Sequence, residues 1–364
     1  MFVALRDLRF AKGRFALMGA VVLLTTLLVT MLSGLTAGLA QENISAVTQL
    51  PADRIVFSTG KGPDGEPAKP SFSDSRITEE TWREWRKAAG VAAAERLGIT
   101  MGRLTHGETG AAAAIFGVQP GDELAKAYGG AVGTGRVVLS TGLAEESGLT
   151  AGDEVQIFGR DFTVAGTGAT ASYSHTPVAW ISIGDWEWIG RQGGADTVAT
   201  VIALRTDPGL DLSATDERLG TTAVPLDAAP TAIGSFSSEN SSLQLMRGFL
   251  FAISALVIGA FFTVWTIQRS GDVAVLKALG AGTGYLMRDA LAQAVIVLLL
   301  GAGLGGAIGA GVGALAEGLV PFVLSAATTV VPVVVMILLG ALGAALAIRK
   351  ITSVDPLTAL GASR

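Results

Sequence analysis

Apolar residues in this chain of 364 are gathered into four long runs. Residues 15–40, 248–267 and 319–348 hold no charged side chain, and Gln293 is the strongly polar member of residues 290–316. A helix rises about 1.5 Å per residue, so roughly 20 apolar residues cross the hydrocarbon core of a bilayer. A helix also satisfies its own backbone polar groups in lipid. The pattern predicts four transmembrane helices, at residues 15–40, 243–267, 289–316 and 319–348.

Two other interpretations of these runs were weighed. Buried helices of a soluble core rarely exceed about 20 apolar residues without a charge. The first run could instead be a signal peptide, since Ala37-Gly38-Leu39-Ala40 is typical of a cleavage site. Its 26 apolar residues exceed the roughly 7 to 15 of a signal peptide. We therefore expect the first run to be retained as a membrane span.

Most basic residues beside the runs lie on one side of the membrane. Residues 1–14, 268–288 and 349–364 together hold 10 Lys and Arg, against Asp7, Asp272, Asp355 and the adjoining Asp289. Because Lys and Arg are retained on the cytoplasmic side, both termini are expected there. Residues 41–242 hold 15 Lys and Arg against 26 Asp and Glu. This acidic segment is expected outside the cell membrane, and its charge gives no support to nucleic-acid binding.

The segment 41–242 is predicted to be a mixed α/β domain inserted between the first and second spans. Residues 79–96 carry an amphipathic pattern that predicts a helix. Short β-rich runs at 137–140, 154–158, 162–165 and 178–182 are separated by Gly, Asp and Ser turns. Their spacing suits a small antiparallel barrel or sandwich packed on an α/β lobe. The chain has no cysteine, so this domain has no disulfides.

Residues 268–288 connect the second and third spans and include a short amphipathic stretch. Ala274, Val275, Leu276 and Leu279 give it an apolar face, and Gly280 is expected to end the helix. Such a helix can lie in the membrane interface or dock in a partner's groove. A plain connector is the alternative that periodicity leaves open.

The same loop carries a family resemblance. Arg269-x-x-Asp272-x-Ala274-x-Leu276-Lys277-Ala278-Leu279-Gly280-Ala281 resembles the loop by which FtsX/MacB-type ABC transporter permeases contact a separate ATPase subunit. The order of one span, an outer domain and three spans, and the ending Asp355-Pro356-Leu357-Thr358-Ala359-Leu360, are similar to that family. The resemblance implies that Asp272, Leu276, Lys277, Leu279 and Gly280 couple the chain to the ATPase, and that the permease is a homodimer with two ATPase subunits.

The chain lacks the residues that nucleotide or hydrolytic chemistry requires. No G-x-x-x-x-G-K-[ST] loop is present, since Gly60-Lys61 is followed by Gly62, so ATP is expected on the partner subunit. His106 and His175 stand apart in the sequence, and no G-x-S-x-G or H-E-x-x-H motif occurs. His175 is more typical of a turn residue than of a ligand. We therefore expect no enzyme, no permanently bound cofactor and no resident metal.

Glycines at Gly301, Gly305, Gly309 and Gly313 form a stripe on the third span. Small residues four apart let a second helix approach closely, so the stripe predicts a packing surface. Whether it faces the same subunit or a second copy is left open by the sequence.

Candidate substrate residues lie near the outer ends of the first two spans. They are Glu42, Arg247, Met31, Met246, Phe249 and Phe251, with His106 and His175 in reserve. Polar groups at the lipid edge are often functional, although rim charges also commonly extend into the headgroups. In length and in the order of its parts the chain resembles the HrtB-type haem efflux permeases of Gram-positive bacteria. That resemblance implies haem as cargo, with Arg247 facing its propionates and Glu42 its iron.

The expected mechanism is mechanical. ATP-driven closure of the partner subunits would push the helix at residues 272–280, tilt the first two spans and squeeze an amphiphile, taken laterally from the outer leaflet, outward. Two rival functions remain: a signalling permease that activates a cell-wall hydrolase, and an exporter of a peptide antibiotic or a lipoprotein.

Overall fold

The computed structural model describes residues 12–60, 68–129, 131–191, 196–268, 271, 275, 279–316 and 318–352. They form two compact units. The helical unit contains Met1–Gly38 and Ser242–Arg364, and the inserted domain contains Leu39–Ser241. The predicted inserted segment, 41–242, differs from this division by one or two residues at each end.

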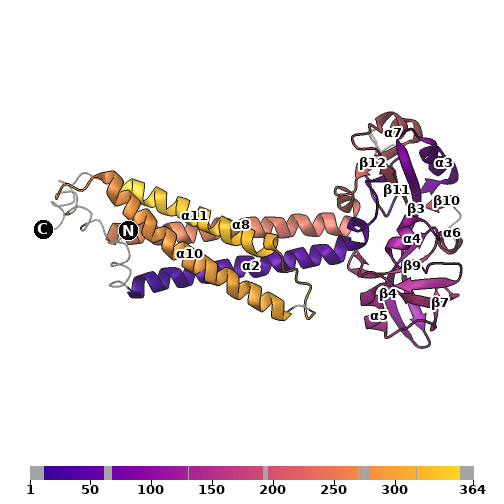
Figure 1. Ribbon diagram of the computed structural model, residues 1–364, viewed down its shortest axis with the longest axis horizontal. Helices are drawn as coiled ribbons and strands as arrows, with labels where there is room; N and C mark the ends of the chain where they lie inside the picture. The colour runs from indigo at the N-terminus through magenta and orange to yellow at the C-terminus, as the bar shows by residue number, and fades with distance from the viewer. Residues whose placement is uncertain are drawn as a thin grey trace. The chain divides into compact units, whose positions relative to one another are not determined.

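Four helices of the described residues are long and apolar enough to cross a membrane. They are α2 (Lys12–Thr48), α8 (Gly234–Gln268), α10 (Thr283–Ala316) and α11 (Ala326–Thr352), and Figure 1 shows them as the four long helices of the chain. With 37 and 35 residues, α2 and α8 each rise more than about 50 Å, whereas the hydrocarbon core is about 30 Å thick. Both helices therefore have residues to spare beyond the membrane. Their surplus ends, residues 39–48 of α2 and 234–241 of α8, belong to the inserted domain.

The prediction of a fourth helix from residue 319 was wrong at its start. The helix α11 begins at Ala326, and Gly318 has φ +85°, a left-handed backbone that ends the preceding helix. Ser325 caps the new helix, because its hydroxyl accepts a hydrogen bond from the N–H of Thr328 at 3.2 Å. The residues between form a loop whose Phe322 is buried against Gly34 of α2 and Gly313 of α10.

The glycine stripe of α10 faces α2 of the same chain. A Cβ added at Gly305 would collide with the carbonyl oxygen of Leu23, and one added at Gly309 would lie 3.1 Å from the Cβ of Thr30. The stripe therefore allows backbone-to-backbone contact between the two helices. The sequence left the partner of this surface open, and the structure identifies it as the chain's own first span.

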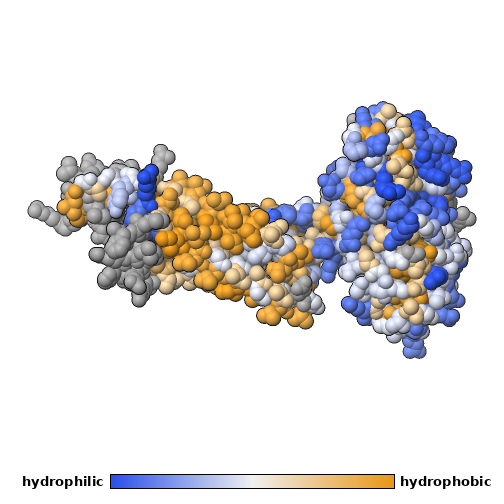
Figure 2. Space-filling view, in the orientation of Figure 1, coloured by the Kyte–Doolittle hydropathy of each residue, from blue (hydrophilic) through white to orange (hydrophobic). Residues whose placement is uncertain are grey.

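The interior of the helical unit is apolar and draws on all four helices. It contains Val22 and Val29 of α2, Phe262 and Trp265 of α8, Leu298 of α10 and Met336 of α11. On the outside, leucines such as Leu24, Leu256, Leu304 and Leu338 are more than half exposed. Figure 2 shows this outer surface as predominantly hydrophobic. A polypeptide that leaves such a surface uncovered in water is unstable, so the surface suits lipid.

Twelve strands are present in the described part of the inserted domain. Nine of them lie along one path in the order β12-β1-β11-β3-β4-β9-β5-β7-β6. Their bounds are β1 Arg54–Ser58, β3 Val91–His106, β4 Thr109–Val118, β5 Arg136–Leu139, β6 Glu154–Ile157, β7 Arg160–Thr167, β9 Thr176–Ser182, β11 Val201–Thr206 and β12 Thr221–Pro225. The short strand β8 (Ser172–Tyr173) pairs with β9, and β2 (Ile77–Thr78) pairs with β10 (Thr197–Ala199).

One half of this path closes into a barrel. Strand β6 pairs with β3 as well as with β7, so β3, β4, β9, β5, β7 and β6 form a ring. Its interior is filled by apolar side chains that include Ile115, Leu139, Phe162 and Ile181. The predicted strands and barrel are therefore present. The expectation of antiparallel pairing throughout was wrong, because β4–β9 and β5–β7 are parallel.

The other half is the predicted α/β lobe. Strands β12, β1, β11 and β3 are antiparallel, and α3 (Glu79–Lys87) packs on them through the fully buried Trp85. Shorter helices complete the domain: α4 Glu123–Ala127, α5 Thr141–Ser147, α6 Ile183–Arg191, α7 Ser213–Leu219 and the 3-10 turn η1 Ala229–Ala232.

The helix predicted for residues 79–96 is too long. It ends at Lys87, and Gly90 then takes a left-handed backbone with φ +77° before strand β3 begins at Val91. The alanines that looked helical pair instead with β11. Pairing in the sheet thus overrides the local helix preference of those alanines.

Candidate functional site

The surplus ends of α2 and α8 meet one β-hairpin of the inserted domain. The hairpin joins β8 to β9 through Ser174 and His175, whose φ angles are +51° and +60°. Two consecutive left-handed residues define the tight turn that suits the twist of a hairpin, but outside glycine and asparagine they cost about 1 kcal/mol each. His175 is therefore a turn residue, as predicted, and the strain is offset by contacts to both helices.

Four hydrogen bonds tie this hairpin to α2. The N–H of Ser174 donates to the carbonyl of Asn43 at 2.9 Å, and the N–H of His175 donates to the carbonyl of Glu42 at 3.3 Å. The hydroxyl of Ser45 accepts from the N–H of Ser172 at 2.9 Å and donates to the Ser172 carbonyl at 3.3 Å. Two of these bonds use backbone carbonyls of α2, and the other two use the side chain of Ser45.

A second set of contacts ties the hairpin to α8. The hydroxyls of Ser174 and Ser235 share a hydrogen bond of 2.8 Å. Asn43, which is fully buried, links the two helices directly: its Oδ1 accepts from Ser235 at 3.1 Å and its Nδ2 donates to Glu239 at 3.2 Å. We call Glu42, Asn43, Ser45, Ser174, His175, Ser235 and Glu239 the junction cluster.

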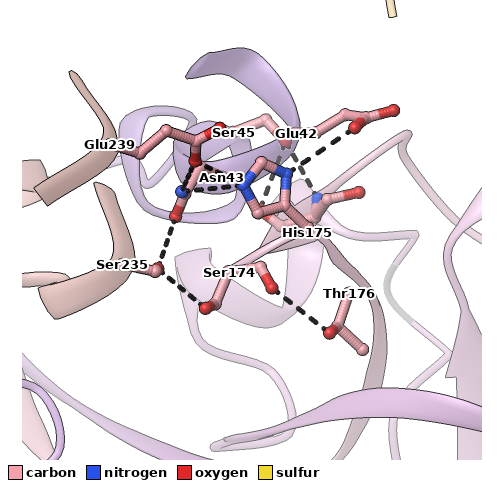
Figure 3. Close-up of polar contacts among 9 residues, drawn as sticks. Glu42, Asn43, Ser45, Ser174, His175, Thr176, Ser235 and Glu239 are labelled. Carbon is pink, nitrogen blue, oxygen red and sulfur yellow. Dashed lines mark hydrogen bonds and ion pairs between the residues drawn. The ribbon is translucent and has the colours of Figure 1, made fainter. Parts of the chain in front are cut away.

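The imidazole of His175 lies between two carboxylates, as Figure 3 shows. Its Nε2 is 2.7 Å from Oε2 of Glu239, and its Nδ1 is 3.7 Å from Oε2 of Glu42. The shorter contact requires a proton on Nε2, which His175 donates to Glu239. The nearby amide of Asn43, 3.1 Å from Nε2, then donates to Glu239 instead of to the ring. The side chains of Glu42, His175 and Glu239 remain between a third and a half exposed.

The ends of both helices are also anchored in the apolar core of the domain. Ala46, Val47 and Leu50 at the end of α2 are buried, and Phe236 of α8 packs on the same core. The hydroxyl of Tyr128 donates to the carbonyl of Ala46 at 3.2 Å, and burial raises the pKa of this hydroxyl, so it stays protonated. The outer ends of both helices are therefore held by the hairpin and by the core of the inserted domain.

The predicted substrate residues fall into two groups. Glu42 belongs to the junction cluster, beside the reserve residue His175. The others belong to the helical unit: Met31 is partly buried on α2, and Arg247 is partly buried on α8. Met246 and Phe249 are 51% and 61% exposed on α8, open to lipid or to another molecule. Phe251 is partly buried and packs instead against the interior of the helices.

The second reserve residue, His106, lies elsewhere in the domain. It ends β3, and its Nδ1 is 2.6 Å from the carbonyl oxygen of Glu154. Among the described residues, no group of three or more His, Cys, Asp or Glu side chains is arranged to hold a metal ion.

Of the predicted coupling residues, Leu279 and Gly280 are described, whereas Asp272, Leu276 and Lys277 lie outside the described residues. The N–H of Leu279 donates to the carbonyl of Val275 at 3.0 Å, a helical bond, and its side chain is 80% exposed. Gly280 has φ +96°, the left-handed backbone expected of a helix-ending glycine.

Sequence reasoning missed Asn43, Ser235 and Glu239. Ser235 and Glu239 precede the apolar run of the second span, so they read as part of a loop. The signal that could have found them is the run of helix-compatible residues from 235 to 247, which lacks Gly and Pro and continues the helix upstream of the membrane.

Comparison with known proteins gives two family matches. Residues 15–222 match the MacB-like periplasmic core domain, and residues 245–356 match the FtsX-like permease C-terminal region. A protein of Staphylococcus haemolyticus named as the HrtB permease of a hemin transport system is 26% identical, over 99% of both chains. An uncharacterised ABC transporter permease of Mycobacterium bovis is 22% identical, also over 99% of both chains.

Solved structures give similarities to the outer domains of two transporters. The periplasmic region of MacB from Actinobacillus actinomycetemcomitans aligns with 51% of this chain and 94% of its own, at 10% identity and a TM-score of 0.35. The extracellular domain of the transporter YknZ from Gram-positive bacteria aligns with 48% of this chain and 99% of its own, at 11% identity and a TM-score of 0.35.

Proposed function

This chain belongs to the FtsX-like permeases that carry a MacB-like periplasmic core domain, and from that membership we propose that it is the permease subunit of an exporter that extrudes haem. ATP is hydrolysed by a separate ABC subunit that binds the loop between α8 and α10. Both termini are cytoplasmic, the inserted domain lies outside, and two permease chains assemble with two ATPase subunits.

The observation that carries this proposal is the continuity of α2 and α8. Each helix runs unbroken from an apolar span into the junction cluster. A helix with all its backbone bonds made transmits a displacement along its axis. Work done by the ATPase on the cytoplasmic loop is thereby delivered to the outer ends of the first two spans, where a laterally bound amphiphile is expelled.

Haem is the proposed cargo for two reasons. The staphylococcal relatives that match over 99% of the chain are named for hemin transport. Haem is also an apolar macrocycle with two carboxylates, and the residues assigned to it have complementary chemistry: Met246 and Phe249 for the ring, Arg247 for the propionates and Glu42 for iron. The cargo is taken laterally from the outer leaflet as a substrate. It is not a resident cofactor.

The proposal is tested by titrating hemin into the full chain in lipid nanodiscs and following the Soret band. The wild type is expected to shift the band at about one hemin per permease dimer. Glu42→Ala is expected to weaken binding about tenfold or more, since a carboxylate ligand is lost. Glu108→Ala removes an exposed carboxylate of the same domain at the β3–β4 turn and serves as the matched control.

The results distinguish an error in the proposed cargo from an error in the proposed binding residue. An unshifted Soret band for the wild type would eliminate haem and favour another cargo or a signalling role. An equal shift for the wild type and Glu42→Ala would eliminate Glu42 as the ligand and direct attention to Met31, Met246 and Arg247.

A further inference from the structure

The inserted domain contains a second feature, a cavity beside the junction cluster. It has a volume of about 570 Å³ and opens between β3, the β8–β9 hairpin and the start of α8. Ligand sites commonly range from about 300 to 1,000 Å³, so the cavity is large enough for a small molecule. Its walls include Ser174 and Ser235, which also join the hairpin to α8.

Three aromatic side chains are among the residues that line the cavity. Phe72, Tyr173 and Trp186 each contribute a mostly buried ring. The rings of Phe72 and Tyr173 meet edge to face with centroids 5.9 Å apart. Gly98 and Gly117 leave the space that the indole of Trp186 occupies, because a Cβ at either position would collide with it. The lining also contains Ser and Thr hydroxyls, so the cavity suits a ligand that has both apolar and polar parts.

The rim supplies one positive charge. Of the described residues that line the cavity, Arg76 alone is charged. It donates hydrogen bonds to the carbonyls of Ser73 and Ser75, at 2.9 and 2.7 Å. Among the described residues it forms no ion pair, so its charge is available to an anion. The half-exposed thioether of Met101 stands at the same opening and adapts readily to apolar ligands.

From the mixed lining of aromatic rings and hydroxyls and from the unpaired arginine, we propose that this cavity binds a planar molecule that has an apolar part and an anionic group. It is a site of the inserted domain, separate from the residues assigned to cargo at the membrane edge. The natural ligand of the cavity would be the cargo after its release from the spans. Only this identification rests on the proposed export function. An occupant would touch Ser174 and Ser235, so binding would stiffen the junction cluster.

The test uses hydrogen exchange of the full chain in lipid nanodiscs, with protoporphyrin IX as the probe. This probe lacks iron, so it does not depend on a metal ligand at Glu42. Exchange is expected to slow about tenfold in residues 97–103 and 172–176 at saturating probe, and to stay unchanged in the β6–β7 hairpin at residues 154–167. The local readout separates the cavity from probe that dissolves in the lipid.

Two variants assign the effect to the cavity. Thr100→Trp places a large side chain in it and is expected to abolish the slowing. Arg76→Gln removes the charge while leaving a donor for the Ser73 and Ser75 carbonyls, and is expected to raise the apparent Kd about tenfold. Arg103→Gln, which neutralises an arginine of β3 outside the cavity, is the matched control and is expected to bind normally.

This proposal would be overturned if protoporphyrin IX did not slow exchange in the wild type. It would also be overturned if the slowing were equal in the wild type, Thr100→Trp and Arg76→Gln. Either result would leave a Soret shift that depends on Glu42 intact, so the failure of the cavity is distinguishable from the failure of haem export. Conversely, protection of the cavity without any Glu42-dependent shift would support the cavity and remove the site proposed at the membrane edge.

Discussion

At the scale of single residues, the β8–β9 turn is held by side chains from two helices, Asn43 of α2 and Glu239 of α8, which both approach His175. The turn at His175 was predictable, because Tyr-Ser-His-Thr-Pro between two β-rich runs is typical of a hairpin. Its partners Asn43 and Glu239 were not predictable, since they lie 132 and 64 positions away. The three side chains come together only in the folded chain. Helix and strand periodicities relate residues a few positions apart, so they do not predict contacts across such separations.

The buried amide of Asn43 leads to a prediction at this scale. Asn43→Ala removes the group that bonds Ser235 and Glu239, and the loss of hydrogen bonds at a buried site costs about 1 to 3 kcal/mol. Amide exchange in residues 172–176 of the full chain should accelerate by about tenfold or more. Gln41→Ala, an exposed change two residues earlier on α2, should leave the exchange unaltered. Unchanged exchange in Asn43→Ala would mean that the amide does not hold the hairpin.

At the scale of helices and strands, the prediction is accurate for features set by neighbouring residues and poor for features set by contacts between residues far apart in the sequence. Length and absence of charge are local properties, so all four spans were found. The start of α11 was placed seven residues too early, although Pro321 and the capping Ser325 interrupt the apolar run. Closure of the barrel by β3–β6 pairing and the parallel pairs depend on long-range contacts, and local patterns do not encode them.

The α2–α10 interface gives the prediction at this scale. Gly305→Ala places a methyl group against the backbone of Leu23 and should destabilise the helical unit by about 1 to 3 kcal/mol. Gly303 lies on the same helix with open space around its Cβ position, so Gly303→Ala should be neutral or slightly stabilising. Loss of helical circular dichroism during titration with SDS measures both. Equal midpoints for the two variants would show that the stripe does not set the helix packing.

At the scale of the whole molecule, the chain is an ABC transporter permease in which α2 and α8 each contribute residues to both compact units. The family plan was readable from one loop motif and the order of spans, because those features are linear in the sequence. The cavity and the junction cluster were not, since they are assembled from β3, the hairpin and both helices.

Coupling to the ATPase is the property that tests the whole assembly. Leu279 is 80% exposed in the loop that the family resemblance assigns to the ATPase contact. Leu279→Asp places a charge in an apolar contact and should lower permease-dependent stimulation of ATP hydrolysis about tenfold or more, because burying an unpaired carboxylate is costly. Gly282→Asp puts the same charge in the same loop, where its carbonyl accepts the first bonds of α10 and an aspartate is a favourable helix cap. Stimulation should survive Gly282→Asp and be lost in Leu279→Asp, with hemin binding retained in both. If Leu279→Asp stimulates hydrolysis as well as the wild type does, the force must enter the permease elsewhere.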